Sequence, residues 1–549
     1  MKKAPQMTVQ NLDHLGLVAG IIDLIGIVEK INEIVGCQPG EIVSPGHAVK
    51  AMLLNGLGLV SAPLYLFSKF FEGKATEHLI GKGIKPEHLN DDRLGRVLDK
   101  LYLSGLSQTF TMIALEAAEK FHVCLETVHL DSSSFHLHGE YKNSLPSVLL
   151  LAESENQGEN GEVIMNTDEV PLPIYITYGY SRDHRPDLKQ FILDLICSGD
   201  GGVPLFLKLA DGNQVDSAVF GQILSDFKQQ LNLDALFVAD SALYTAKNLV
   251  IIKNLKWLSR VPLAVKQAKQ LISQLTDSDF KESKISGYRW SQQCSDYAGI
   301  TQRWLVVESA LRREADLRQL EKAVKKSETE AKQKIKQLSA QKFACGTDAI
   351  DAAEQLSKKF KYHQLTQIEA REFCPKKSSQ QFYKVQADLE VDAGVIAGEI
   401  QKAGRFILAT NVLDNNELSP DQILETYKQQ QCAERGFSFL KDPLFFTDSV
   451  FIKSSERIES LALIMGLCLL VYTLAQRDLR SRLKQEEAFL KNQLGQPTNR
   501  PTLRWIFQCF QSVHLLTFES VQTISNLTIE RLSILKFFPD ACRRYYLLS

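Results

Sequence analysis

The chain has 549 residues, 44% of them hydrophobic, which is enough for several cores and, by usual domain sizes, about three or four domains. Lys and Arg number 63 against 65 Asp and Glu, and the net charge of -2 lacks the positive excess that many DNA-binding proteins carry. A local basic surface remains compatible with this balance. The ten cysteines form no C-x-x-C pair, and residues 1–16 have no apolar signal core. We therefore expect reduced cysteines and a cytoplasmic location.

The first part of the chain has helical periodicity. Apolar residues recur at steps of three and four between Ile21 and Val35, as on one face of a helix. Ser44 followed by Pro45 is a helix start, because Ser is a good cap and Pro suits the first turn. We predict an all-helical N-terminal domain over residues 1–122.

A mixed α/β pattern follows over residues 123–263. Short runs rich in β-branched and aromatic residues predict strands, and two longer amphipathic runs predict helices. The predicted strands are 125–141, 172–183, 203–212, 235–240 and 256–262, and the predicted helices are 213–231 and 241–255. This alternation predicts a mixed α/β sheet.

Residues 264–403 break that rhythm and are predicted to be an insertion domain. Strands are expected at 303–309 and 380–391. The run 311–338 between them is helical and highly charged. Because acidic residues are interleaved throughout it, we interpret this run as a solvated helix rather than a DNA-binding arm.

A strand at 405–411 restores the α/β pattern, and the second part of the sheet domain is predicted over residues 404–475. The run 418–443 is a helix with Ser419 as cap, Pro420 at the first position and Gln422 completing a capping box.

Residues 460–475 are almost wholly apolar, but these 16 residues fall short of the roughly 20 that a bilayer requires. We therefore expect a buried helix and no membrane span. Residues 476–549 are predicted to form a helical C-terminal region.

Two aspartates stand at the ends of apolar strands. Asp131 follows Val-His-Leu, and Asp240 follows Leu-Phe-Val-Ala. Strand ends of an α/β sheet are common ligand sites, and carboxylates can share a divalent cation. Taken singly, either Asp more often serves a turn or caps a helix.

Glu434 gains interest from its neighbours. Tyr427, Gln430, Glu434 and Lys441 are separated by steps of three, four and seven, which place them on one helical face. The alternative is an amphipathic helix whose polar face happens to carry these side chains.

The pattern Y-x2-Q-x3-E-x6-K closely resembles the Y-x2-R-x3-E-x6-K signature of bacterial insertion-sequence transposases of the DDE class. The segments LDSSSF, VADSALYT and RPTLRW are also similar to parts of that family. The resemblance implies a ribonuclease-H-like catalytic domain interrupted by an insertion rich in strands. It makes Asp131, Asp240 and Glu434 the metal ligands and catalytic residues. Gln430 departs from the family, because a basic residue there is thought to engage transposon DNA.

The resemblance implies a DNA transposase that cleaves the ends of an insertion sequence and joins them to target DNA. Two Mg²⁺ ions about 3.5–4 Å apart would be held by the three acids, and Mn²⁺ can substitute. The implied partners are double-stranded DNA, as terminal inverted repeats and target, and a second copy of the chain on paired ends, in the cytoplasm at the nucleoid. Two alternatives stay open, namely a nuclease without joining activity and a DNA-binding relative that has lost catalysis.

Further candidates for DNA contact follow. Tyr427, Gln430 and Lys441 lie beside Glu434, and Lys441 and Tyr427 would position backbone phosphates. Arg182 and Arg185 either contact phosphate or belong to an ordinary polar loop. Residues 441–549 hold 14 Lys and Arg against 10 Asp and Glu, so some positive charge is concentrated late in the chain.

His136 and His138 would face the same side of a strand, which makes a zinc pair conceivable. No third ligand is obvious nearby in the sequence, so we favour the simpler reading of two strand histidines.

Overall fold

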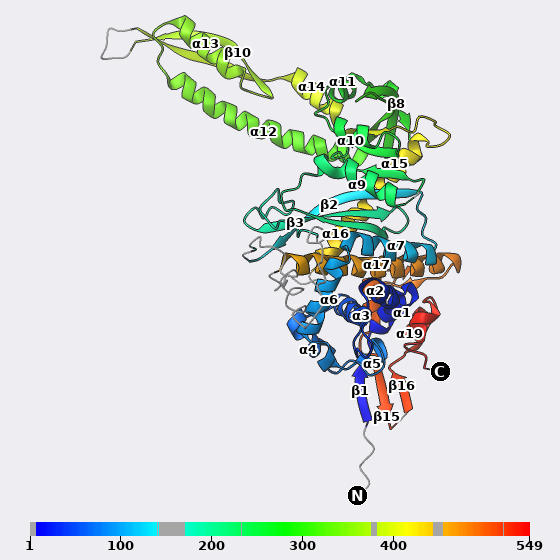
Figure 1. Cartoon of the computed structure of the whole chain (residues 1–549). Helices are drawn as coiled ribbons and strands as arrows, with labels where there is room; N and C mark the ends of the chain where they lie inside the picture. The colour runs from blue at the N-terminus through cyan, green and yellow to red at the C-terminus, as the bar shows by residue number, and fades with distance from the viewer. Residues whose placement is uncertain are drawn as a thin grey trace, which may run out of the picture. The chain divides into compact units, whose positions relative to one another are not determined.

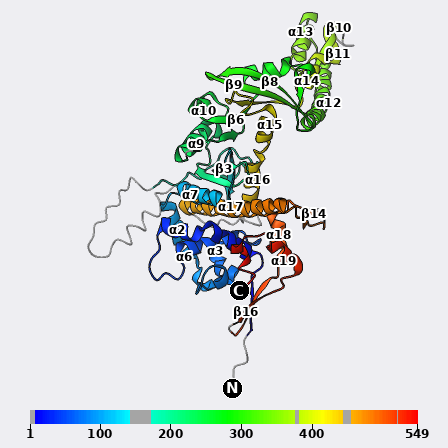
Figure 2. The same cartoon turned by 90° about the vertical axis from the view of Figure 1, so that its right-hand side faces the viewer.

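The computed structural model describes residues 7–139, 141, 171–231, 233–374, 381–442, 454–519 and 521–548. The chain divides into two compact units (Figure 1, Figure 2). The first comprises Met1–Trp257 and Thr426–Ser549, and the second comprises Leu258–Glu425.

A four-stranded arrangement lies in the first unit. Its strands are β2 (Thr127–Leu137), β3 (Lys189–Ser198), β4 (Pro204–Ala210) and β5 (Leu236–Ala239), in the order β4-β3-β2-β5. β3 is antiparallel to both β2 and β4, whereas β5 is parallel to β2. α9 (Asp216–Gln230) connects β4 to β5, and α10 (Ala246–Ile251) follows β5. The mixed α/β sheet predicted from the sequence is therefore confirmed.

One predicted strand is wrong. Within 172–183 only Thr177 pairs, through an isolated bridge to Gln190, and the second strand is β3 instead. Pro171 and Pro173 have no N–H to donate to a ladder, which disfavours a strand there. β3 is buried along nearly its whole length, as its continuous apolar sequence requires.

The N-terminal part is mainly helical, as predicted. Its longer helices are α1 (Leu15–Ile25), α2 (Ile27–Val35), α3 (Pro45–Gly56), α6 (Asp91–Leu103) and α7 (Leu106–Lys120), with short α4 (Phe67–Phe71) and α5 (Thr76–Leu79). Ser44 caps α3 by accepting a hydrogen bond from the backbone of His47. The periodic run from Ile21 to Val35 forms two helices, because Gly26 has a φ of 86° and interrupts the helix.

The N-terminal part is not all-helical, because its first strand pairs with the end of the chain. β1 (Met7–Asn11) joins β15 (His514–Phe518) and β16 (Val521–Ser525) in one antiparallel sheet. The expected helical C-terminal region therefore contains a hairpin. Its helices are α18 (Leu503–Cys509), α19 (Ile529–Leu535) and α20 (Asp540–Arg543), and two short strands, β13 (Leu490–Lys491) and β14 (Pro497–Thr498), precede them.

A long helix, α17 (Ser455–Gln485), runs through the first unit and contacts α1, α3, α6, α7 and β4. Among the described residues it is the one helix long and apolar enough to cross a bilayer, yet 89% of its most apolar window is buried in the protein. This burial confirms the buried helix that was predicted at 460–475.

The second unit contains a run of antiparallel strands in the order β6-β12-β9-β8-β7. The strands are β6 (Lys256–Val261), β7 (Lys281–Glu282), β8 (Tyr288–Tyr297), β9 (Ile300–Ser309) and β12 (Arg405–Thr410). The helices are α11 (Lys266–Gln274), α12 (Ala310–Ala340), α13 (Gly346–Ser357), α14 (Ala393–Lys402) and α15 (Pro420–Lys428), and β10 (His363–Phe373) pairs with β11 (Phe382–Val391). The strands expected at 303–309, 380–391 and 405–411 and the charged helix at 311–338 are thus confirmed.

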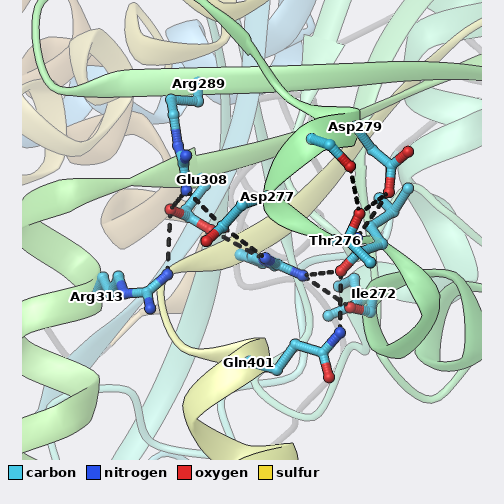
Figure 3. Close-up of polar contacts among 11 residues, drawn as sticks. Ile272, Thr276, Asp277, Asp279, Arg289, Glu308, Arg313 and Gln401 are labelled. Atoms are coloured by element: carbon cyan, nitrogen blue, oxygen red, sulfur yellow. Dashed lines mark hydrogen bonds and ion pairs between the residues drawn. The ribbon is translucent and has the colours of Figure 1, made fainter.

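A buried ionic network holds the second unit together at the end of β9 (Figure 3). Glu308 is 5% exposed and Arg405 is 4% exposed, and the guanidinium Nε of Arg405 lies 3.0 Å from the Glu308 carboxylate. Arg289 and Arg313 also converge on Glu308, at 2.5 Å and 3.3 Å. Arg405 further donates to the carbonyl oxygens of Ile272 and Leu275. These residues come from five elements, β8, β9, β12, α11 and α12, so the network connects all five.

Candidate active site

Asp131 and Asp240 lie on neighbouring parallel strands. The last paired residues of β2 and β5 are Leu130 and Ala239. Asp131 and Asp240 each come one residue later, so the same register sets them side by side and directs both side chains to one face. The carboxyl end of β5 and the middle of β2 thus bring the two predicted acids together.

Asp131 is a largely buried carboxylate with few compensating groups. Its Oδ1 accepts a hydrogen bond from the backbone N–H of Ser132 at 2.8 Å, and its side chain is 16% exposed. The pKa of Asp131 is raised to about 7, mainly by burial; Arg182 opposes the rise, and the negative charges of Asp240 and Glu434 contribute to it. Asp131 therefore interacts electrostatically with both of the other acids.

Asp240 begins the turn that leads into α10. Its Oδ1 accepts from the backbone N–H of Ala242 at 2.9 Å, and its side chain is partly exposed. Accepting such a bond is the ordinary role of an Asp at a strand end. Asp240 forms this bond while its position in the register keeps it beside Asp131.

Glu434 lies on α16 (Gln431–Leu440), which packs against β2 and β3. The predicted single helix over 418–443 is divided, because α15 ends at Lys428 and α16 starts at Gln431. The capping box of Ser419 and Gln422 is present. Glu434 itself is exposed, and its charge reaches Asp131.

Gln430 turns inward at the break between the two helices. It is 7% exposed, its Nε2 donates to the carbonyl oxygen of Leu130 at 2.7 Å, and its Oε1 lies 3.1 Å from Nδ1 of His129. Burial lowers the pKa of His129 to about 4, so the ring is neutral at physiological pH. Gln430 thereby ties the start of α16 to the strand segment immediately before Asp131, and its predicted contact with DNA stays a prediction.

Lys441 follows the end of α16 and pairs with the polar loop before β3. Its Nζ lies 2.7 Å from the Asp183 carboxylate and 5.3 Å from the ring centre of Phe135 on β2. Asp183 also faces His136, at 3.4 Å from Nδ1. Tyr427 is half-buried near the end of α15. Lys441 is thus positioned on the β2 side of the site, and no DNA is needed to hold it there.

Arg182 reaches the site, whereas Arg185 does not enter these contacts. The guanidinium of Arg182 forms an ion pair with Asp216, donates to Ser132 Oγ at 2.8 Å, and lies 3.8 Å from the Asp131 carboxylate. Arg185 forms an exposed pair with Asp187 at 2.8 Å. From the sequence, both arginines were expected either in a polar loop or in contact with phosphate. In the structure, Arg182 forms an ion pair with Asp131, and Arg185 does not.

The prediction from the sequence did not include several polar residues of this region. Ser132 donates to Asp216 at 2.6 Å, and Asp194 on β3 accepts from Gln214 at 3.0 Å. Asp194 is fully buried, and this burial raises its pKa to about 7. A charged residue inside the otherwise apolar run of β3 was a usable signal, because an unpaired carboxylate is rarely buried.

Within the described ranges, no three His, Cys, Asp or Glu side chains stand close enough together to hold a metal ion in their present positions. This includes His136 and His138. The donor set of Asp131, Asp240 and Glu434 is nevertheless the kind that hard divalent cations prefer, and the mutual repulsion at Asp131 is what a cation would relieve.

Two family models match the chain. Residues 126–472 match the family described as Transposase DDE domain, and residues 7–115 match one described as Domain of unknown function (DUF4277). None of the curated proteins matches the sequence.

Among solved structures, the chain is similar to a cryo-EM structure of the piggyBac transposase synaptic complex with hairpin DNA. The identity is 8% and the TM-score 0.37, over 92% of this chain and 83% of that one. A likeness this weak supports no conclusion about the fold. The family match covers more than half of the chain and includes all three acids, and the chain therefore belongs to the Transposase DDE domain family.

Proposed function

We propose that this transposase cleaves the ends of an insertion sequence and joins them to target DNA by metal-dependent phosphoryl transfer. The observation that carries the proposal is the placement of Asp131 beside Asp240 on parallel strands, with the charge of Glu434 acting on Asp131. A buried carboxylate with a raised pKa, such as Asp131, beside a second acid at a strand end is typical of functional sites.

The proposed catalytic domain is ribonuclease-H-like. The order β4-β3-β2-β5, with β5 parallel to β2 and the other neighbours antiparallel, supports this assignment. So does the chain order, in which the first acid is on β2, the second follows β5, and the third comes after the strands of the second unit.

Asp131, Asp240 and Glu434 would hold divalent metal, with Mg²⁺ as the expected ion and Mn²⁺ as a substitute. Bound metal supplies activation of a water or a DNA 3′-hydroxyl and stabilisation of the leaving oxygen. The chain's own contribution is to orient the carboxylates. Arg182 offsets part of their repulsion, and the Ser132 N–H holds one oxygen of Asp131 in place.

Other side chains around the acids would bind and position DNA. Four side chains are proposed to contact backbone phosphates. The cations are Lys441, Arg182 and Arg185, and the phenol of Tyr427 would contribute a hydrogen bond. Gln430 is proposed to act indirectly by holding α16 against β2. The proposed partners are terminal inverted repeats, target DNA and a second copy of the chain on paired ends, and the proposed location is the cytoplasm at the nucleoid.

The test is cleavage and strand transfer with a labelled duplex that carries the element's end. Asp131→Asn, Asp240→Asn and Glu434→Gln should each lower the cleavage rate at least about a hundredfold with Mg²⁺, because each removes a carboxylate that cannot be replaced. Glu425→Gln changes an exposed acid on α15 and should leave the rate unchanged. Full cleavage by Asp131→Asn would overturn the assignment.

Product analysis separates the alternatives. Joined products establish a transposase, whereas cleavage without joined products indicates a nuclease on the same fold. A protein that binds the terminal duplex but neither cuts nor joins it with Mg²⁺ or Mn²⁺ indicates a relative that has lost catalysis.

A further inference from the structure

The second unit carries a small sheet with a core of its own. β10 and β11 form a hairpin, and residues of α12, α13 and the hairpin pack in a cluster made of Leu338, Ala349, Ala353, Leu365 and Val385. The two helices cover one face of this sheet (Figure 1). The alternation along β11 therefore turns Val385 to the helices and Lys384 to the other face.

Three basic residues stand in one row across that outer face. Arg371 on β10 is directly opposite Lys384 on β11. On the other side of β11, Phe343 and Tyr383 exchange both backbone hydrogen bonds at 2.9 Å. In this antiparallel register, Lys342 is the residue opposite Lys384. Neighbouring strands are about 4.8 Å apart, so the three cations span about 10 Å.

Such a row is unfavourable for the sheet by itself, because like charges directly opposite one another destabilise strand pairs. Within the described part of the chain, no carboxylate forms an ion pair with Lys342 or Lys384. Arg371 lies 3.6 Å from the carboxylate of Glu369, and the side chains of these two residues are each more than 60% exposed. An exposed pair of this kind contributes little. Among the described residues, the three cations thus share one ion-pair partner, the exposed Glu369.

Two aromatic rings support the row. Phe373 and Phe382 are opposite each other in the next position of the same face. The Nζ of Lys384 lies 4.1 Å from the ring centre of Phe373, and the Nζ of Lys342 lies 5.6 Å from that of Phe382. These contacts brace the lysine side chains along the sheet and leave their ammonium groups available to an external anion.

We propose that this row, Lys342, Lys384 and Arg371, binds the phosphate backbone of duplex DNA. A linear array of cations with one weak, exposed ion pair among them matches a polyanion with regularly spaced charges better than a single small anion. Two exposed acids of the hairpin, Asp388 and Glu390, lie toward its other end, whereas Glu369 and Glu372 lie beside the row. The three cations of the row outnumber these two acids, so the basic end is locally positive although the whole chain has a net charge of -2. The inference rests on the proposed function, to which it adds a DNA contact outside the sheet that carries the acids.

The experiment measures the affinity of the full-length protein for a duplex with the element's end, by fluorescence anisotropy at several salt concentrations. Lys342→Ala, Arg371→Ala and Lys384→Ala are combined in one variant. Each phosphate contact adds about 0.9 to the slope of log K against log salt, so the variant should lose about 2–3 from the slope. Its affinity should fall at least about tenfold at low salt.

A matched control removes the same number of charges from α12. Arg318→Ala, Lys325→Ala and Lys332→Ala delete three exposed cations, each of which is paired with a glutamate four residues earlier. This control should keep the wild-type slope. The charge-conserving variant Lys342→Arg, Arg371→Lys, Lys384→Arg should also bind as the wild type does, which excludes a folding defect at the row.

The outcomes distinguish the two proposals. If the wild type cleaves and binds the terminal duplex while the triple alanine variant keeps its full slope and affinity, this inference is wrong and the proposed function stands. A loss that is equally large in the α12 control would also overturn it, because the effect would then come from net charge. A wild-type protein that binds no duplex would overturn both.

Discussion

The side-chain amide of Gln430 donates to the carbonyl oxygen of Leu130 at 2.7 Å, one residue before Asp131. This bond joins the first turn of the Glu434 helix to the strand that carries the first acid. The carboxamide oxygen of Gln430 accepts from His129 at 3.1 Å, so both halves of the amide are used inside the protein. Gln430 thus links α16, which carries Glu434, directly to β2, which carries Asp131.

Gln430→Ala should therefore weaken both stability and catalysis. The substitution leaves the Nδ1–H of buried His129 unpaired, which costs about 1–3 kcal/mol, and frees the start of α16 to move. We expect a lower midpoint in urea unfolding and a lower kcat with a nearly unchanged KM for DNA. Gln431→Ala, one residue later and exposed, is the control and should change neither quantity.

Gln430→Arg restores the residue that the resembling family has at this position, but the site here is buried beside a neutral histidine. A buried guanidinium without a carboxylate partner is costly, so we expect this variant to be less stable than the wild type and not tighter in DNA binding. A wild-type melting temperature with stronger binding would instead indicate that the side chain reaches DNA.

The sequence allowed the prediction that Asp131 and Asp240 lie together at strand ends. It did not allow the prediction that the side chain of Gln430 points into the protein. Asp131 and Asp240 end apolar runs, and parallel pairing then brings such residues together by local rules. Gln430 was expected on the same helical face as Glu434, but the helix breaks between Lys428 and Gln431 and the periodic argument fails there. The break depends on packing against β2, which is contributed by residues three hundred positions earlier.

The same limit applies to the ends of the chain. Nothing local in β1 indicates that Met7–Asn11 pairs with His514–Phe518, because both are short strands and they lie at opposite ends of the sequence. The split of the periodic run at Gly26 is likewise a tertiary effect, since Gly costs a helix only about 1 kcal/mol. Long-range pairing therefore accounts for most of what the sequence did not reveal.

Gly20 allows the close approach of α1 and α20. A Cβ at this position would lie 2.4 Å from Cα of Cys542 and 2.6 Å from the carbonyl oxygen of Ala541, both backbone atoms. Gly20→Ala should force these helices apart and lower the free energy of unfolding by about 1–3 kcal/mol. Thermal unfolding measures this loss.

Gly398 is the opposite case within α14. It has nothing within 4 Å of the added Cβ, so Gly398→Ala should raise the stability of the second unit by about 0.5–1 kcal/mol through helix propensity. Destabilisation by both alanines alike would show that the close approach at Gly20 is not the cause.

Glu459 on α17 should make stability depend on pH. Burial raises the pKa of Glu459 to about 8, and its Oε1 accepts from the backbone N–H of Ile174 at 2.8 Å. Because the folded-state pKa is higher than the unfolded value, the stabilising effect is complete below the unfolded pKa. It is lost as the pH rises through about 8.

Glu459→Gln keeps the acceptor for Ile174 and removes the ionisation. The melting temperature of the wild type should therefore fall more steeply than that of the variant between pH 4.5 and about pH 8, and the difference between the two curves should level off above about pH 8. Parallel curves would mean that Glu459 does not titrate in this range.

Glu308 pairs with three arginines of the second unit, Arg289, Arg313 and Arg405. Burial alone would raise its pKa, but hydrogen bonds from Arg289 and Arg405 outweigh burial and leave the pKa of Glu308 below its ordinary value. This stabilisation is present above the unfolded pKa and is lost as the pH falls through the lower folded-state value. The second unit should accordingly unfold in acid when this carboxylate is protonated.

Glu308→Gln should reproduce that loss at neutral pH. It leaves Arg405, which is 4% exposed, with carbonyl acceptors but no buried counter-charge, and breaking a buried pair in this way costs about 3–5 kcal/mol. Hydrogen exchange followed by mass spectrometry should show faster exchange in β8, β9 and β12. Glu314→Gln removes an exposed partner of Arg318 on α12 and should change exchange little. Equal protection in both variants would mean that packing around Arg405, rather than the charge of Glu308, holds these strands.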